Sequence, residues 1–178
     1  MTEAVQLSAA FPVAATLGAT LHERRLTIAF AESCTGGLLG AALTAVPGAS
    51  DYVVGGVIAY ADAVKSDMLG VSRHLLAEEG AVSEDVAVAM AEGVRERLAA
   101  DIGVAITGVA GPGAEPAGKP AGLAFVAVSW RLGSVAVRLE GDHGREANRA
   151  LAVREALDLC AAALRRMDGA GSPGGESR

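Results

Sequence analysis

The chain has 178 residues, a length that suits one domain with a sizeable core and is short for two. Apolar residues make up 51% of it but aromatic residues only 3%, so alanine, valine, leucine and isoleucine must build the core. The net charge of −6 argues against broad nucleic-acid binding, which requires a basic surface, but allows a small anionic ligand held by a few local donors.

The N-terminal segment and the cysteines indicate a cytoplasmic protein. Residues 1–10 lack the basic and long apolar segments of a secretory signal, and no uncharged apolar run reaches the roughly 18 residues of a membrane span. Cys34 and Cys160 do not suggest a disulfide framework. We expect a soluble domain over residues 1–167 and a disordered Gly/Ser-rich tail over 168–178.

Helices and strands alternate in the first part of the sequence. Hydrophobic spacing predicts a helix over 7–25, a strand over 27–31, a helix over 38–46, a strand over 52–61 and a short helix over 63–69. Pro12 is tolerated only near the first turn of its helix, and Pro47 and Gly48 end the helix before them. Gly55-Gly56 predicts a bulge or a close backbone approach.

The second part of the sequence ends in a hairpin and a helix. A helix should begin after the capping hydroxyl of Ser83, with a buried stripe formed by Val86, Met90, Val94 and Leu98. The pattern then predicts a strand over 102–106, a glycine-rich loop over 109–121, paired strands over 123–130 and 134–140, and a helix through 150–164. This order of elements predicts a three-layer α/β/α sandwich with a mixed, largely parallel sheet.

The segment Ala31-Glu32-Ser33-Cys34-Thr35-Gly36-Gly37 is the strongest candidate for an active site, because it turns a buried strand directly into a helix. Free N–H groups at a helix start can bind an anion, so Thr35, Gly36 and Gly37 are candidate donors. A hydroxyl on such a turn is also exposed enough to attack a substrate, which makes Ser33 a candidate nucleophile. Both uses are open at this point.

A second glycine loop follows another predicted strand at Thr107-Gly108. Ligands of parallel α/β sheets bind beyond the carboxyl ends of the strands, so we expect Thr107 to lie beside Ser33. The loop matches neither the phosphate-loop pattern nor the dinucleotide-binding pattern.

A base that could activate a serine must come from a small set of side chains. The three histidines are scattered and none lies in a glycine turn or at a strand end. Lys65 is one of only two lysines among the 15 basic residues, and a desolvated lysine can act as a base whereas arginine cannot. An ordinary solvated lysine is the alternative. Tyr60 could relay a proton or could simply be a core residue.

Two arginines and one cysteine complete the set of candidates. Arg145 and Arg149 are four residues apart at the start of the last helix, where an anionic ligand would offset their unfavourable position in the helix dipole. A solvated helix face is the alternative. Cys34 is a weaker candidate nucleophile, and no metal-ligand set emerges from the sequence.

These motifs together resemble the CinA C-terminal domain family, the nicotinamide-nucleotide amidases or NMN deamidases. The resemblance covers nearly all of residues 8–165, in the right order. The segments that carry it, besides residues 31–37, are Pro47-Gly48-Ala49-Ser50, Gly55-Gly56-Val57-Ile58-Ala59-Tyr60 with Lys65, Leu69-Gly70-Val71, and Ile106-Thr107-Gly108-Val109-Ala110-Gly111-Pro112-Gly113. Fuller members carry a further N-terminal domain, so this chain resembles the stand-alone form.

The resemblance implies hydrolysis of nicotinamide mononucleotide to nicotinate mononucleotide and ammonia by a serine/lysine mechanism without a metal or cofactor. The residues that it marks as the site are Ser33, Ser50, Tyr60, Lys65 and Thr107. We favour Ser33 as nucleophile and Lys65 as base, with Ser50 as the alternative nucleophile or a proton relay. Thr107, Gly108 and the glycine turn would stabilise the oxyanion or bind the phosphate. The family also suggests a homodimer or larger homo-oligomer.

The sequence departs from the family at one place. Two additional residues separate Asp142 from Arg145, which leaves open whether Arg145 or Arg149 meets the phosphate. A catalytically inactive nucleotide-binding or partner module of the same fold is the alternative function. A general esterase would require a histidine base that the sequence does not offer.

Overall fold

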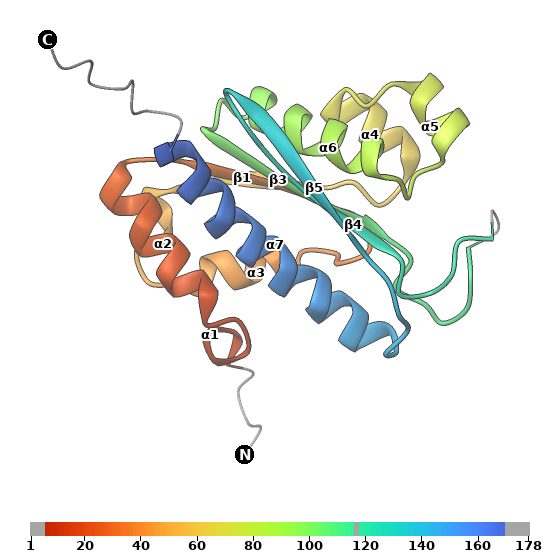
Figure 1. Cartoon of the computed structure of the whole chain (residues 1–178), viewed down its shortest axis with the longest axis horizontal. Coiled ribbons are helices and arrows are strands. Elements are labelled where there is room, and N and C mark those ends of the chain that lie inside the picture. The colour runs from red at the N-terminus through yellow and green to blue at the C-terminus, as the bar shows by residue number, and fades with distance from the viewer. Residues whose placement is uncertain (1–5, 116–117, 170–178) are drawn as a thin grey trace, which may run out of the picture.

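The computed structural model describes residues 6–115 and 118–169, which form a five-stranded sheet between two helical layers (Figure 1). The strand order is β2-β1-β3-β4-β5. Strands β1 (Ile28–Glu32), β2 (Val53–Ile58) and β3 (Ile102–Gly108) are parallel, whereas β4 (Ala124–Trp130) and β5 (Gly133–Leu139) form an antiparallel hairpin beside β3. The predicted three-layer sandwich with a mixed sheet is confirmed.

Each face of the sheet has its own helical layer and its own apolar core. One face is covered by α1 (Leu7–Ala10), α2 (Val13–Arg24), α3 (Leu38–Thr44) and α7 (Arg145–Gly169), and the other by α4 (Asp62–Leu69), α5 (Arg73–Glu79) and α6 (Glu84–Arg97). In the predicted α6 stripe Val86, Met90 and Val94 are fully buried against the sheet, whereas Leu98 is the C-cap of the helix and only partly buried. Gly103 lets α6 approach closely, because a Cβ there would lie 2.0 Å from the carbonyl oxygen of Ala91.

For the glycine pair the prediction is a bulge or a close approach, and the edge strand β2 has a bulge directly before Gly55 and a close contact at Gly56. The pairing of β1 with β2 shifts between Ile28 and Ala29, which skips Val54 and forms a bulge. A Cβ on Gly56 would lie 2.2 Å from the ring of Phe30, so only glycine fits there. The bulge and the close contact fix the position of β2 against β1, and therefore the position of the carboxyl end of β2.

The helices differ from the prediction by one or two residues at the end of α3 and the start of α4, and more substantially in three places. The single helix predicted over 7–25 is two helices, because Pro12 begins α2 while Phe11 ends α1 and is buried in the core. Helix α5 is not in the prediction, since none of its residues is fully buried and only the Ser72 cap marks its start. Helix α7 runs to Gly169, two residues into the predicted tail, and residues 170–178 lie outside the described part.

Candidate functional site

The carboxyl ends of β1 and β3 lie side by side. Glu32 of β1 pairs with Ile106 of β3, and the Ser33 N–H donates to the Ile106 carbonyl oxygen over 2.9 Å. Thr107 is the next residue of β3, so the expected juxtaposition of Ser33 and Thr107 is confirmed. The geometry follows directly from the parallel register of the two strands.

A cavity of about 350 Å³ opens at this edge, and we call it the Ser33 cavity. Six of the predicted site residues line it: Ser33, Tyr60, Lys65, Thr107, Gly108 and Arg145. The glycine loop supplies residues 109–115 of the wall, and the connection between α5 and α6 supplies Ala81 and Val82. Elements that are distant in the sequence therefore converge on one polar cavity.

Lys65 is buried, unlike a lysine on a solvated helix face. Helix α4 starts at Asp62 and places Lys65 in its first turn, where the residue is 1% exposed. The Lys65 Nζ donates to Asp62 Oδ1 over 3.1 Å, and the Asp62 side chain is largely exposed. The cavity thus contains an amine held by a carboxylate, and none of the three histidines lines it.

Arg145 spans the mouth of the cavity. Its guanidinium donates from Nη1 to the Gly111 carbonyl oxygen over 2.7 Å and from Nη2 to the Tyr60 hydroxyl over 3.2 Å. Tyr60 is 60% exposed, so it is not a core residue. The two contacts tie the end of β2, the glycine loop and the start of α7 together around the cavity.

Arg149 lies behind the serine turn and not in the cavity. Its Nη2 donates to the Thr35 carbonyl oxygen over 2.6 Å. The additional residues before Arg145 fold back on α7, since Asp142 Oδ1 accepts from the Gly144 N–H and the Asn148 side chain. These hydrogen bonds, the Asn148 contact first, lower the pKa of Asp142. Of the two arginines, Arg145 lines the Ser33 cavity and Arg149 does not.

The structure corrects the expected anion site at the start of α3. The Gly36 N–H donates to the Ser33 carbonyl oxygen over 3.1 Å, and the Gly37 N–H donates to Glu32 Oε2 over 3.1 Å. The first bond closes the turn within the backbone, and the second forms because the acidic side chain at the end of β1 reaches the helix start. Thr35 is fully buried and does not line the Ser33 cavity.

The expected role of Thr107 in gripping an oxyanion or phosphate also changes. Its hydroxyl donates to the Ala81 carbonyl oxygen over 2.6 Å, and a carbonyl can only accept. The Thr107 hydroxyl can therefore act only as an acceptor toward the cavity, and an acceptor suits an N–H group of a ligand.

The structure does not bring Ser50 to the cavity. Ser50 lies in a short 3-10 turn, Ala49–Asp51, that follows α3 and precedes β2. This turn lies at the amino edge of the parallel strands, since the Ile28 N–H donates to the Tyr52 carbonyl oxygen. Helix α3 thus separates Ser50 from Ser33 within the chain.

Cys34 lines the cavity but is poorly suited to attack. Burial raises the pKa of its thiol from 9.0 to about 11, and the negative charge of Glu32 adds to the increase. The reactive thiolate is therefore scarce at neutral pH. Cys34 and Cys160 are both free thiols.

Sequence reasoning missed two carboxylates that act at the site, Asp62 and Glu32. Asp62 could have been found from its spacing, because residues i and i+3 of a helix are neighbours and Lys65 follows it by three. Glu32 carries no such signal, since its partners are backbone N–H groups.

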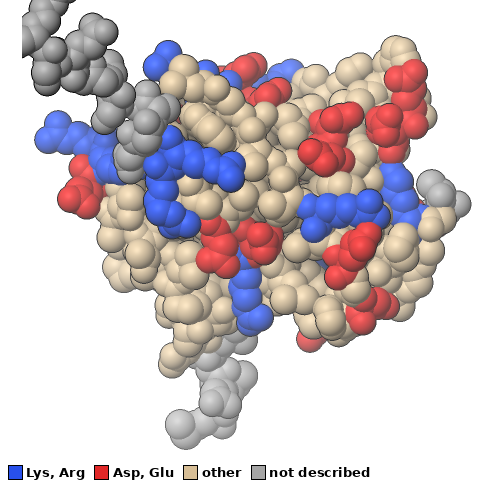
Figure 2. Space-filling model, in the orientation of Figure 1, with Lys and Arg blue, Asp and Glu red and all other residues tan. Residues whose placement is uncertain are grey.

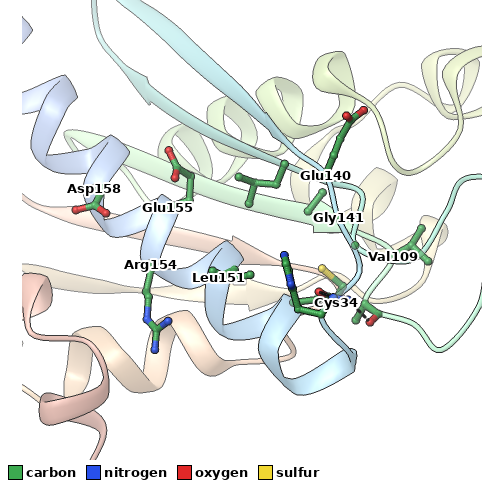
Figure 3. A pocket seen from close by; sticks show the side chains of 14 residues that line it. Cys34, Val109, Glu140, Gly141, Leu151, Arg154, Glu155 and Asp158 are labelled. Atoms are coloured by element: carbon green, nitrogen blue, oxygen red, sulfur yellow. Dashed lines mark hydrogen bonds between the residues drawn. The ribbon is translucent and has the colours of Figure 1, made fainter.

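A second cavity of about 280 Å³ adjoins the first across Cys34, Val109 and Ala110. Figure 3 shows it between α7 and the end of β5, with Leu151 of α7 and the Cys34 sulfur facing its interior. Acidic side chains from both elements, Glu140, Glu155 and Asp158, are among its lining residues.

Other parts of the described chain add little to the choice of function. Lys and Arg side chains are interspersed with Asp and Glu on the face shown in Figure 2. Among residues 6–115 and 118–169, no three His, Cys, Asp or Glu side chains gather as a metal site would require. No helix in the same ranges combines the length and the apolar character needed to cross a membrane.

Several solved structures have the same fold. A competence/damage inducible protein from Agrobacterium tumefaciens is 38% identical with a TM-score of 0.84, and covers 91% of this chain and 98% of its own. A CinA superfamily protein from Escherichia coli is 34% identical with a TM-score of 0.81, over 89% of this chain and 91% of its own.

Sequence relatives extend well beyond the matched region. A CinA-like protein of Gloeobacter violaceus is 49% identical over 149 residues, which are 83% of this chain and 35% of the relative. The chain thus spans about a third of the length of such relatives. The sequence model of the CinA C-terminal domain matches residues 10–164. This chain therefore belongs to the CinA C-terminal domain family.

Proposed function

We propose that this protein hydrolyses the carboxamide of nicotinamide mononucleotide to give nicotinate mononucleotide and ammonia. One observation carries the proposal: the buried amine of Lys65 and the hydroxyl of Ser33 face the same cavity, which no histidine lines. A serine requires a base before it can attack, and Lys65 is a buried side chain of the same cavity that can serve as one. The choice of amide follows the family resemblance.

The reaction uses Ser33 and Lys65 in two stages. The Lys65 Nζ, in its neutral form, takes the Ser33 proton while the Ser33 Oγ attacks the carboxamide carbon. The C–N bond then breaks, the Lys65 ammonium returns the proton to the leaving nitrogen, and ammonia departs. Water hydrolyses the resulting ester and releases the nicotinate product and free Ser33. Asp62 orients the amine through its 3.1 Å contact.

The cavity offers matching groups for both ends of the substrate. Thr107 accepts a hydrogen bond from the carboxamide N–H, because its own proton is held by Ala81. Arg145 offers a planar cation at the mouth that suits a phosphate, and Tyr60 and Gly111 hold it there. A volume of about 350 Å³ lies within the range of small-molecule sites.

Release of ammonia from nicotinamide mononucleotide tests the proposal. Lys65→Met and Lys65→Arg should both lose activity by about a thousandfold or more, because neither side chain can accept the serine proton. Comparing the two separates loss of the base from loss of the charge. Full activity in Lys65→Met would exclude the lysine mechanism. Binding of the nucleotide by calorimetry without turnover in the wild type would favour an inactive binding module instead.

A further inference from the structure

The carboxylate of Glu32 is buried at the start of α3. Glu32 is the last residue of β1 and is 0% exposed. Its Oε2 accepts from the N–H groups of Gly37 over 3.1 Å and Leu39 over 3.0 Å, and its Oε1 accepts from the Gly40 N–H over 2.8 Å. These residues are the N-cap and the second and third residues of the helix. A side chain from the preceding strand therefore fills the place that a bound anion would take.

The Glu32 side chain connects the chain before Ser33 to the helix after it. The Glu32 backbone is fixed in the sheet, where its carbonyl accepts from the Ala59 N–H over 2.7 Å. The Ser33 N–H is fixed to the Ile106 carbonyl, and the chain then turns through Gly36 to the N–H groups that the Glu32 carboxylate holds. The residue before the serine and the helix after it are thus tied by charge-assisted hydrogen bonds.

The negative charge of Glu32 also acts on other groups of the serine turn. No ion pair involving Glu32 occurs within the described part of the chain, and three backbone N–H groups at the helix start bind its carboxylate instead. Its charge contributes to the raised pKa of Cys34. A second anion at the helix start would meet the same negative charge, whereas the Arg145 guanidinium at the Ser33 cavity would attract a phosphate.

We infer that Glu32 is a positioning residue that holds Ser33 in its reactive orientation and excludes the substrate phosphate from the start of α3. The inference rests on the proposed function, since it takes Ser33 as the nucleophile. It predicts that loss of the carboxylate slows attack by Ser33 even in a folded protein, because a small displacement of a nucleophile can cost about a hundredfold in rate.

A fluorophosphonate reagent measures attack by Ser33 without the natural substrate. The Ser33 Oγ forms a bond to phosphorus as fluoride leaves, and the serine proton passes to the base. Glu32→Gln should be labelled on the order of 10–100-fold more slowly than the wild type. Its kcat for nicotinamide mononucleotide should fall in proportion, with KM changed less than about threefold. Glu32→Asp keeps the charge and should give an intermediate rate.

Asp101→Asn provides the control. Asp101 accepts from the N–H and the hydroxyl of Thr27 at the opposite edge of the sheet, so the variant removes a carboxylate bound to backbone without touching the serine turn. Its labelling rate should equal that of the wild type. Thermal unfolding of every variant sets the assay temperature well below each transition.

A further variant covers the case in which Glu32→Gln does not fold. Glu32→Gly leaves space for formate, and formate should restore labelling where chloride at equal ionic strength does not. A folded Glu32 variant labelled within twofold of the wild type would overturn the inference, as would loss of the fold in all three variants, since the carboxylate would then serve the fold alone. Absence of Ser33 labelling in the wild type would instead overturn the proposed function.

Discussion

The two edges of the parallel strands carry similar side chains in different surroundings. At the carboxyl edge Ser33 is 8% exposed and shares a cavity with the buried Lys65. At the amino edge Ser50 is exposed, and the nearby pair of Asp51 with His22 is 3.2 Å long with both side chains more than half exposed. Helix α3 joins the two edges, with one serine near each end.

Under the proposed function, this difference in surroundings is the reason that Ser33 and not Ser50 serves as the nucleophile. Solvent screens the His22–Asp51 pair and leaves both groups free to move. At the carboxyl edge the amine of Lys65 is withdrawn from solvent and fixed by Asp62, and the strand register fixes the serine. Preorganisation of this kind is what raises the rate of a serine hydrolase.

Replacing Ser33 and Ser50 separately should give the largest difference in activity between the two edges. Ser33→Ala should lower kcat for nicotinamide mononucleotide by about a thousandfold or more, because the nucleophile is gone. Ser50→Ala should retain at least about half of the activity, since the exposed hydroxyl lies at the other edge of the sheet. Ammonia release measures both. An equal loss in Ser50→Ala would contradict the separation of the two edges.

Alkylation of Cys34 tests how strongly the carboxyl edge is withdrawn from solvent. With a pKa of about 11 in place of 9.0, the thiolate fraction at pH 8 is roughly a hundredfold smaller than in an exposed cysteine. Iodoacetamide should therefore modify the native protein slowly, and the rate should rise about tenfold per pH unit between pH 8 and 10. Mass spectrometry of the peptide follows the reaction. A rate that reaches a plateau near pH 8 would show an activated thiol.

Replacement of Arg145 tests the mouth of the cavity. Arg145→Met should raise KM for nicotinamide mononucleotide by about 10–30-fold with a smaller change in kcat, because it removes a contact to the phosphate and not to the reacting amide. The matched control is Arg73→Met, which removes an exposed arginine paired with Asp67. An unchanged KM in Arg145→Met would place the phosphate elsewhere.

The sequence is sufficient for the fold class and for six of the residues that line the Ser33 cavity, but not for the rest of the lining or for how its polar groups are used. Hydrophobic spacing predicts the strands, and the rule for parallel sheets then places Thr107 beside Ser33. The partners of Thr107 and Gly37 depend on side chains and loops that meet only in the folded chain, so the free donors expected there are already paired. The order of the chain already places Ser33 before α3 and Ser50 after it, whereas the family resemblance groups both serines in one site.

The smallest expected effects come from the two tyrosines, Tyr52 before β2 and Tyr60 after it. The Tyr52 hydroxyl at the amino edge is buried and has no hydrogen-bond partner within residues 6–115 and 118–169. Burial raises the pKa of Tyr52, in keeping with a hydroxyl kept from water. Because an unpaired buried hydroxyl costs free energy, Tyr52→Phe should increase the free energy of unfolding by about 1 kcal/mol, or Tm by roughly 2–4 °C, without loss of activity.

Tyr60→Phe should behave in the opposite way. The Tyr60 side chain is exposed, so its stability should change by less than about 0.5 kcal/mol, while loss of the 3.2 Å contact to Arg145 should lower kcat/KM severalfold. Thermal unfolding and ammonia release on the two variants separate the effects. A destabilised Tyr52→Phe would mean that its hydroxyl binds an ordered water.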